Sequence, residues 1–297
     1  MAEIFECIPN ISEGRRADVV AKCVRAVSEV KGITLMNYSS DINHNRSVIT
    51  FMGEFEAVEE AAVRLSRRAT ELIDLREHRG EHPRVGALDV LPFVPLREAS
   101  RERAIELSIR VAKRIWEENG VPVYLYEDSA TAPHRKNLAD IRRGQFEGLS
   151  EKTKGGDWLP DFGEGFHASA GVTVTGARFP LIAYNFNLST SDLSIAKSIA
   201  KKIRESSGGL AGVKALGVML ESENVAQVTV NLVDYTKTPL HILTERVREE
   251  ARLYGVEVVE AELIGLVPMR AMSEAAAYYL KIADFNPKTR VIEEFLV

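Results

Sequence analysis

The order in which strand-like and helix-like segments follow one another constrains the fold of this chain most strongly. In the second half, a β-branched and aromatic run at 179–188 precedes a segment at 189–206 whose apolar residues recur at helical spacing behind Ser/Thr caps. Two short apolar runs then flank the turn-like ESEN, and a helix is predicted from the Thr-Pro pair at 238–239 to Gly255. A last strand is predicted at 256–267, which completes β-α-β-β-α-β, the order of ferredoxin-like folds.

The first half shows the same order without being a sequence copy of the second. The predicted elements are a strand at 3–11, a helix at 15–32, strands at 33–38 and 46–53 joined by SSDINHN, a helix from Phe55 to Leu75 and a strand at 87–96 interrupted by Pro92 and Pro95. Ser100 is then expected to cap a helix that ends at Asn119, and VPVYLYE adds a strand. The glycine-rich stretch at 128–176 is expected to be a long ordered loop, and loops of that length are usually functional.

These patterns predict an α/β (α+β) fold made of two ferredoxin-like-related units. We expect the units to comprise residues 1–178 and residues 179–297. A chain of 297 residues is long enough to build two such cores.

The net charge and the cysteine content narrow the class of protein. A net charge of −5 gives no electrostatic footprint for duplex nucleic acid, so an anionic ligand must be bound by a local group of arginines. The N-terminus lacks the basic and apolar regions of a signal peptide, and no apolar run is long enough to span a membrane. We therefore expect a cytoplasmic protein with no nucleic-acid or membrane partner. Cys7 and Cys23 are expected to be buried thiols rather than a disulfide or metal ligands.

The segment LREHRGEHPRVGALDV raises two alternative chemistries. His78, Glu81 and His82 have the H-x-x-E-H spacing of one class of zinc peptidase, which requires both histidines on one continuous helix. Gly80 weakens a helix there and Pro83 disfavours the helical conformation at His82, so we predict no metal site. His78 is expected to be a solvated residue near a helix end. His82 lies in an irregular segment, where catalytic groups are often found, although a lone loop histidine is more often not catalytic.

Blocks of sequence distributed over nearly the whole chain resemble the formiminotransferase family, whose members pass a formimino group between glutamate and tetrahydrofolate. In order, the blocks are ECIPNISEGR, HNRSVITFMG, EHPRVGALDVLPFVPL, PVYLYE, NLADIRRGQFEGL, GARFPLIAYNFNL, GGLAGVKALGVML and YGVEVVEAELIGLVP. The resemblance implies two subdomains with facing mixed sheets, helices on the outside and a folate-binding tunnel between the sheets. It also implies a homodimer and a place in one-carbon metabolism and histidine degradation, and since the chain ends at Val297 no cyclodeaminase activity is expected.

The resemblance implies that His82 is the catalytic acid/base, because it occupies the histidine of the H-P-R-x-G-A-L-D block. A neutral imidazole can take the proton from the attacking folate nitrogen and return one to the departing glutamate nitrogen. The family pattern D-x5-N-R would place an aspartate at position 39, where this chain has Ser39. Asp41 is the nearest carboxylate and the second catalytic candidate, since a carboxylate would stabilise positive charge around the intermediate. Alternatively, Asp41 only caps a turn.

Folate and formiminoglutamate both carry carboxylates, so the substrate site needs cations and polar groups. The candidates for substrate or folate binding, all in or beside the family blocks, are Asn10, His44, Arg46, Arg84, Gly86, Arg178 and Lys214. For the arginines and the lysine, a solvated surface position is an equally good explanation, and Asn10 or His44 can instead close a turn.

We therefore expect a folate-dependent formiminotransferase that converts N-formimino-L-glutamate and tetrahydrofolate to L-glutamate and 5-formiminotetrahydrofolate, with tetrahydrofolate as co-substrate and no metal. A formyl-group variant acting on 5-formyltetrahydrofolate or N-formylglutamate would suit the same residues. A non-catalytic folate-binding protein is the alternative from another class. RNA binding on an exposed sheet is disfavoured, because the chain has neither aromatic stacking motifs nor basic strands.

Overall fold

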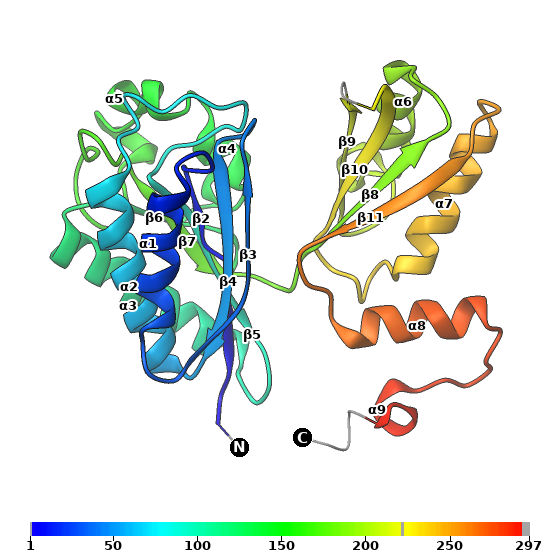
Figure 1. Ribbon diagram of the computed structural model, residues 1–297, viewed down its shortest axis with the longest axis horizontal. Helices are drawn as coiled ribbons and strands as arrows, with labels where there is room; N and C mark the ends of the chain where they lie inside the picture. Colours follow the sequence, from blue (N-terminus) through cyan, green and yellow to red (C-terminus); the bar gives the residue numbers. More distant parts are fainter. Residues whose placement is uncertain (1, 221–222, 293–297) are drawn as a thin grey trace. The chain divides into compact units, whose positions relative to one another are not determined.

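The structure of the protein is a computed structural model that describes residues 2–220 and 223–292. The chain forms two compact units that divide between Arg178 and Phe179. Each unit has its own sheet and its own hydrophobic core, so the predicted class of two α+β units is confirmed (Figure 1).

A mixed sheet forms the centre of the first unit. Its strands are β1 (Phe5–Cys7), β2 (Asn10–Ile11), β3 (Ile33–Asp41), β4 (Arg46–Gly53), β5 (Leu88–Pro95), β6 (Val123–Leu125) and β7 (Thr173–Ala177). They lie in the order β3-β4-β1/β2-β5-β7-β6. As far as β5 this is the ferredoxin-like order with antiparallel pairs, whereas β7 and β6 extend the sheet in parallel. The predicted β-α-β-β-α-β order is thus confirmed within a larger sheet.

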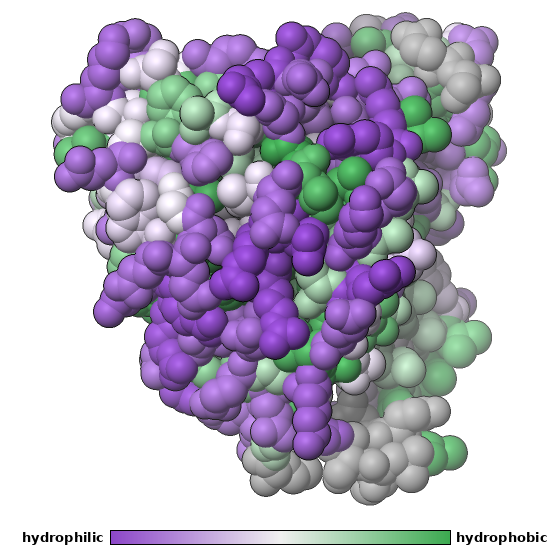
Figure 2. Space-filling model, turned by 60° about the vertical axis from the view of Figure 1, so that its left-hand side comes forward, coloured by the Kyte–Doolittle hydropathy of each residue, from purple (hydrophilic) through white to green (hydrophobic). Residues whose placement is uncertain are grey.

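The helices α1 (Ala17–Ser28), α2 (Phe55–Leu72) and α3 (Arg101–Asn119) cover one face of this sheet (Figure 1). Their apolar faces supply much of the core of the unit, and the side of the molecule that carries them is largely hydrophilic outside (Figure 2). Ser100 caps α3 as predicted, because its side chain accepts a hydrogen bond from the backbone N–H of Arg103. Gly120 ends the helix in the left-handed conformation, with φ of 67°.

The strand β5 is continuous, so the predicted interruption by Pro92 and Pro95 was wrong. Pro92 lies opposite Ile8, whose N–H donates to the Pro92 carbonyl oxygen at 3.2 Å, and this is where β1 and β2 part. The missing N–H of the proline therefore costs pairing with that neighbour only, while β7 holds β5 on the other side in unbroken register. Pro95 is the last residue of the strand.

The stretch at 128–176 contains more regular structure than the predicted loop. It includes the short helices α4 (Leu138–Arg142) and α5 (Leu149–Lys152) and several single 3-10 turns. It also contains most of β7, a buried strand that pairs on one side with β5 and on the other with β6. A strand this short carries little local signal, and its pairing on both sides is what stabilises it.

The second unit is an antiparallel sheet in the order β11-β8-β10-β9, which is the ferredoxin-like order. Its strands are β8 (Ile182–Leu188), β9 (Val213–Leu220), β10 (Val225–Leu232) and β11 (Val258–Ile264), with the helices α6 (Leu193–Ile203) and α7 (Leu240–Arg252). The predicted order of this half is confirmed, and the first two residues of the predicted ESEN turn lie outside the described residues. The helices α8 (Met269–Tyr279) and α9 (Pro287–Arg290) were not predicted.

The cysteines behave as predicted, because Cys7 and Cys23 are both free and fully buried. Burial raises the pKa of the Cys23 thiol to about 12, so it stays protonated. Of the helices that the structure describes, none is both long and apolar enough to cross a membrane.

Candidate active site

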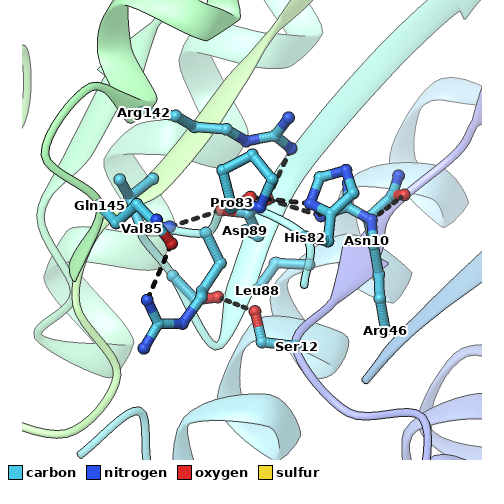
Figure 3. Close-up of polar contacts among 12 residues, drawn as sticks. Asn10, Ser12, Arg46, His82, Pro83, Val85, Leu88, Asp89, Arg142 and Gln145 are labelled. Carbon is cyan, nitrogen blue, oxygen red and sulfur yellow. Dashed lines mark hydrogen bonds and ion pairs between the residues drawn. The ribbon is translucent and has the colours of Figure 1, made fainter. Parts of the chain in front are cut away.

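His82 lies in the irregular segment between α2 and β5, where Arg46 of β4 approaches it (Figure 3). The Nδ1 atom of His82 is 3.0 Å from Nη1 of Arg46 and 2.8 Å from the carbonyl oxygen of Pro83. Burial of the ring, together with the positive charges of Arg46 and Arg142, lowers the pKa of His82 to about 3. The imidazole is therefore neutral at physiological pH and available as a proton acceptor.

Two arginines share one buried carboxylate next to His82 (Figure 3). Oδ2 of Asp89 lies 2.9 Å from Nη1 of Arg46 and 2.6 Å from Nη2 of Arg142, and Oδ1 accepts a hydrogen bond from the N–H of Val85 at 2.8 Å. Burial by itself raises the pKa of Asp89, but Arg142 and Arg46 more than reverse this effect and hold it at about 2. Asp89 is thus an anion at neutral pH, and we name these three residues the Arg-Asp-Arg cluster.

Arg46 is oriented by Asn10 as well as by Asp89. The Nε of Arg46 donates to Oδ1 of Asn10 at 3.0 Å, and Nδ2 of Asn10 donates to the carbonyl oxygen of Ile8 at 2.9 Å. Asn10 pairs with Val48, two residues along β4 from Arg46, so both side chains emerge on the same face of the sheet. The structure therefore brings the predicted residues Asn10, Arg46 and His82 together, with Asn10 as a positioning residue.

His78 is buried, with 7% of its surface exposed, so the expectation of a solvated residue was wrong. Its Nε2 lies 2.8 Å from the carbonyl oxygen of Asn45, and its Nδ1 accepts a hydrogen bond from Nε of Arg84 at 3.2 Å. A neutral ring with its proton on Nε2 satisfies both contacts, and burial lowers the pKa of His78 in the same direction. His78 thereby links the loop before β4 to the segment that carries His82.

The guanidinium of Arg84 donates hydrogen bonds to other side chains of the protein. It reaches both carboxylate oxygens of Glu147, at 2.7 and 2.9 Å, and donates to Oε1 of Gln145 at 3.1 Å in addition to its contact with His78. The residue is only 6% exposed. These contacts favour a scaffolding role for Arg84, since they use its hydrogen-bond donors within the protein.

The H-x-x-E-H spacing does not lie on a helix, because α2 ends at Leu72, before His78. At Gly80 an added Cβ atom would lie 2.3 Å from the carbonyl oxygen of His44, so the two loops meet too closely for any side chain. Within residues 2–220 and 223–292, no three His, Cys, Asp or Glu side chains are grouped so that they could hold a metal ion.

Asp41 and His44 form a pair beside His82. Oδ1 of Asp41 accepts a hydrogen bond from the backbone N–H of His44 at 2.8 Å, and Oδ2 lies 3.0 Å from Nδ1 of the same histidine. The ring of His44 packs edge-on against that of His82, with centroids 6.0 Å apart. The described contacts thus connect Asp41 to His82 through His44. Ser39, at the position where the family pattern would place an aspartate, is an exposed residue of β3 opposite Val48.

The remaining predicted residues lie elsewhere. An added Cβ at Gly86 would lie 2.1 Å from the carbonyl oxygen of Val172, so this glycine permits close backbone packing. Arg178 follows β7 and interacts with Tyr126, whose pKa burial raises to about 12. Lys214 is an exposed residue of β9 in the second unit, opposite Asn231.

The sequence interpretation missed Asp89 and Arg142, although both lie within the quoted blocks. A lone aspartate inside the apolar run ALDVLPFV is a usable signal, because a carboxylate rarely lies in a buried strand without a cationic partner. Nothing local distinguishes Arg142 from Arg143, and only the structure separates them. Arg142 is 11% exposed and binds Asp89, whereas Arg143 is 80% exposed and pairs with Asp140.

We expect acid to destabilise the first unit partly through His82 and His78. Both pKa values lie below the ordinary 6.5, so the unfolded chain binds more protons than the folded chain as the pH falls below that value. The two histidines leave the free energy of unfolding unchanged above about pH 6.5 and lower it as the pH falls toward their folded pKa values. His82 contributes a slope of at most about 1.4 kcal/mol per pH unit. Urea unfolding at several pH values should give a shallower slope for His82→Asn than for the parent. Equal slopes would show that His82 does not titrate differently on unfolding.

Comparisons with known proteins match both units to one family. Residues 4–178 match the formiminotransferase domain, N-terminal subdomain, and residues 183–295 match the formiminotransferase domain. The chain is 48% identical to the glutamate formimidoyltransferase of Streptococcus pyogenes serotype M1, with 100% of each chain covered. It is 45% identical to the glutamate formimidoyltransferase of Thermoplasma acidophilum, with 95% of this chain and 94% of that one covered. It is 41% identical to the formimidoyltransferase-cyclodeaminase of Mus musculus, and the match covers 99% of this chain and 60% of that protein.

Proposed function

The chain belongs to the formiminotransferase family, and on that basis we propose that it transfers a formimino group from N-formimino-L-glutamate to tetrahydrofolate, giving L-glutamate and 5-formiminotetrahydrofolate. The observation that carries the proposal is a neutral, partly buried His82 in contact with Arg46. Full-length identity of 45–48% to two glutamate formimidoyltransferases supports the same reaction.

The reaction requires two proton transfers, and His82 supplies both. N5 of tetrahydrofolate attacks the formimino carbon, and the imidazole accepts the proton that N5 loses as the new C–N bond forms. The tetrahedral intermediate then breaks its bond to the glutamate nitrogen, which receives a proton from the imidazolium. The ring is thereby returned to its neutral form. The depressed pKa of His82 makes the neutral ring a weaker base in the first transfer and the imidazolium a stronger acid in the second.

The surroundings of Nδ1 support both roles. With the proton on Nδ1, the ring donates to the Pro83 carbonyl oxygen and leaves Nε2 free to accept a proton. With Nδ1 bare, it accepts a hydrogen bond from Arg46, and Nε2 carries the proton. Among the described residues Nε2 makes no hydrogen bond, so it is the atom that faces substrate in the proposed mechanism.

Asp41 remains the second catalytic candidate in this proposal. Its carboxylate contacts Nδ1 of His44, and the His44 ring packs against His82. In this proposal the carboxylate of Asp41 stabilises the positive charge that develops around the intermediate.

Membership of the family also leads us to propose the ligands, the metabolic role, the oligomeric state and the location of the protein. The enzyme binds tetrahydrofolate and a glutamate derivative, acts in one-carbon metabolism and histidine degradation, forms a homodimer and resides in the cytoplasm. Sedimentation of the purified protein tests the dimer, and fractionation of the source cells tests the location.

An assay of the purified protein with tetrahydrofolate and N-formimino-L-glutamate tests the function. We expect stoichiometric release of L-glutamate and formation of 5-formiminotetrahydrofolate, each measured by liquid chromatography. N-formyl-L-glutamate serves as the comparison donor, and faster turnover of that compound would identify a formyltransferase instead. Binding of tetrahydrofolate in calorimetry without turnover of either donor would identify a folate-binding protein.

A further inference from the structure

We propose that the guanidinium of Arg142, together with that of Arg46, binds the α-carboxylate of the glutamate-derived substrate. The inference rests on the proposed function for the identity of the ligand. It assigns the substrate-binding role to a residue that family resemblance and sequence pattern did not single out.

The Arg-Asp-Arg cluster carries one more positive charge than negative charge. Arg46 and Arg142 both contact the same oxygen of Asp89, and among the described residues no second carboxylate contacts either guanidinium. His82 is neutral, so the histidine does not change this balance. Two guanidiniums in a desolvated site repel each other, and burial together with this repulsion lowers the pKa of Arg46 to about 10. A second anion would complete the site electrostatically.

Arg142 also has hydrogen-bonding capacity that the protein does not use. Its Nε atom is buried and has no hydrogen-bond partner among the described residues, while Nη2 is bound to Asp89. A buried N–H without an acceptor is costly, and a carboxylate is the acceptor that a guanidinium fork binds best. Arg142 shares Asp89 with Arg46, which contacts His82, and its charge helps to lower the pKa of His82 (Figure 3), so a bound anion would lie near the imidazole.

The end of α4 that carries Arg142 is held in place. Ile141 is fully buried, and Nζ of Lys152 donates to the carbonyl oxygens of Asp140 and Ile141 at 2.9 and 2.5 Å. A lysine on the last carbonyl groups stabilises a helix end, and burial with the nearby Arg143 lowers the pKa of Lys152 to about 8. Arg142 is therefore presented by an anchored turn.

The position of the cluster distinguishes between the carboxylates of the two substrates. In formiminoglutamate, the α-carbon joins the α-carboxylate to the nitrogen that receives a proton from His82, so this carboxylate must lie next to the imidazole. In tetrahydrofolate, the whole p-aminobenzoyl group separates N5 from the glutamate tail. Nη1 of Arg46 is 3.0 Å from Nδ1 of His82. The cluster therefore suits the α-carboxylate of the small substrate.

Binding of ligands that differ only in the α-carboxylate tests the inference without turnover. We expect the parent protein to bind L-glutamate about 10- to 100-fold more tightly than γ-aminobutyrate in calorimetry, and Arg142→Met to lose that difference. Arg143→Met is the matched control, because the adjacent arginine is 80% exposed, and it should bind like the parent. Arg142→Met keeps Asp89 paired with Arg46, and Arg142→Lys is a second variant that keeps the charge and should show an intermediate difference.

Kinetics test the same inference by comparing N-formimino-L-glutamate with N-formimino-γ-aminobutyrate, each with the parent protein and with Arg142→Met. We expect Arg142→Met to lower kcat/KM for the first compound about 10- to 100-fold and to leave the second nearly unchanged. An equal reduction for both compounds would overturn the inference. So would loss of the preference for tetrahydrofolate over tetrahydropteroate in Arg142→Met, because the bound carboxylate would then be that of the folate tail. If the parent turns over neither compound, the proposed function fails. The comparison of L-glutamate with γ-aminobutyrate in calorimetry still decides whether Arg142 binds the α-carboxylate.

Discussion

Replacement of His82 by asparagine is expected to lower kcat about a thousandfold while the protein stays folded. A positioned general acid/base contributes about 10²- to 10⁴-fold to a rate, and His82 serves in both proton transfers of the proposed reaction. Asparagine keeps an acceptor that can receive the Arg46 hydrogen bond made by Nδ1 of the histidine. The loss should therefore come from missing proton transfer rather than from a rearranged Arg-Asp-Arg cluster.

Steady-state kinetics with the concentrations of the two substrates varied separately measure this effect. KM for each substrate should change far less than kcat, and the melting temperature should stay close to that of the parent. His241→Gln is the control, because His241 lies on α7 of the second unit and stacks on Tyr278. If His82→Asn retains more than a tenth of the parent kcat, His82 is not the acid/base.

Replacement of Asp89 by asparagine is expected to destabilise the first unit by about 3–5 kcal/mol and to abolish activity. Removing one partner of a buried ion pair leaves the other charge desolvated and uncompensated, and here two guanidiniums lose their shared carboxylate. Arg46 would also lose a contact that orients it toward His82. The effect on stability is therefore much larger than that of an exposed ion pair.

Urea denaturation followed by circular dichroism measures the free energy of unfolding of each variant. Glu151→Gln is the matched control, because it breaks an exposed pair with Lys154 and should cost less than about 1 kcal/mol. The double variant Asp89→Asn/Arg142→Met should be more stable than Asp89→Asn alone, since it buries one uncompensated charge instead of two. A double variant less stable than Asp89→Asn would contradict the charge argument.

Local sequence was sufficient for the β-α-β-β-α-β order of each unit and for much of the reasoning about His82, but not for β7 or the helices α4, α5, α8 and α9. Ser100 caps α3 through its side chain, and the apolar residues of α2 and α6 recur at helical spacing. Pro83 and Gly80 argue against a zinc-binding helix, because each disfavours the helical conformation at its own position or at the neighbouring residue. Such features depend on neighbours along the chain, and so they can be inferred from it.

The environment of His82 was decided by contacts that are distant in sequence. Arg46 is 36 residues from His82, and Arg142 is 53 residues from Asp89. No local pattern separates Arg142 from Arg143 or predicts that His78 is buried and His44 packs against His82. Sheet register and desolvation determine these outcomes, because both arise only when separate segments pack together. The sequence by itself determined the β-α-β-β-α-β order of the two units and pointed to His82. The tertiary structure decided which charges surround this histidine, since charge pairing in a buried site requires segments that come together only on folding.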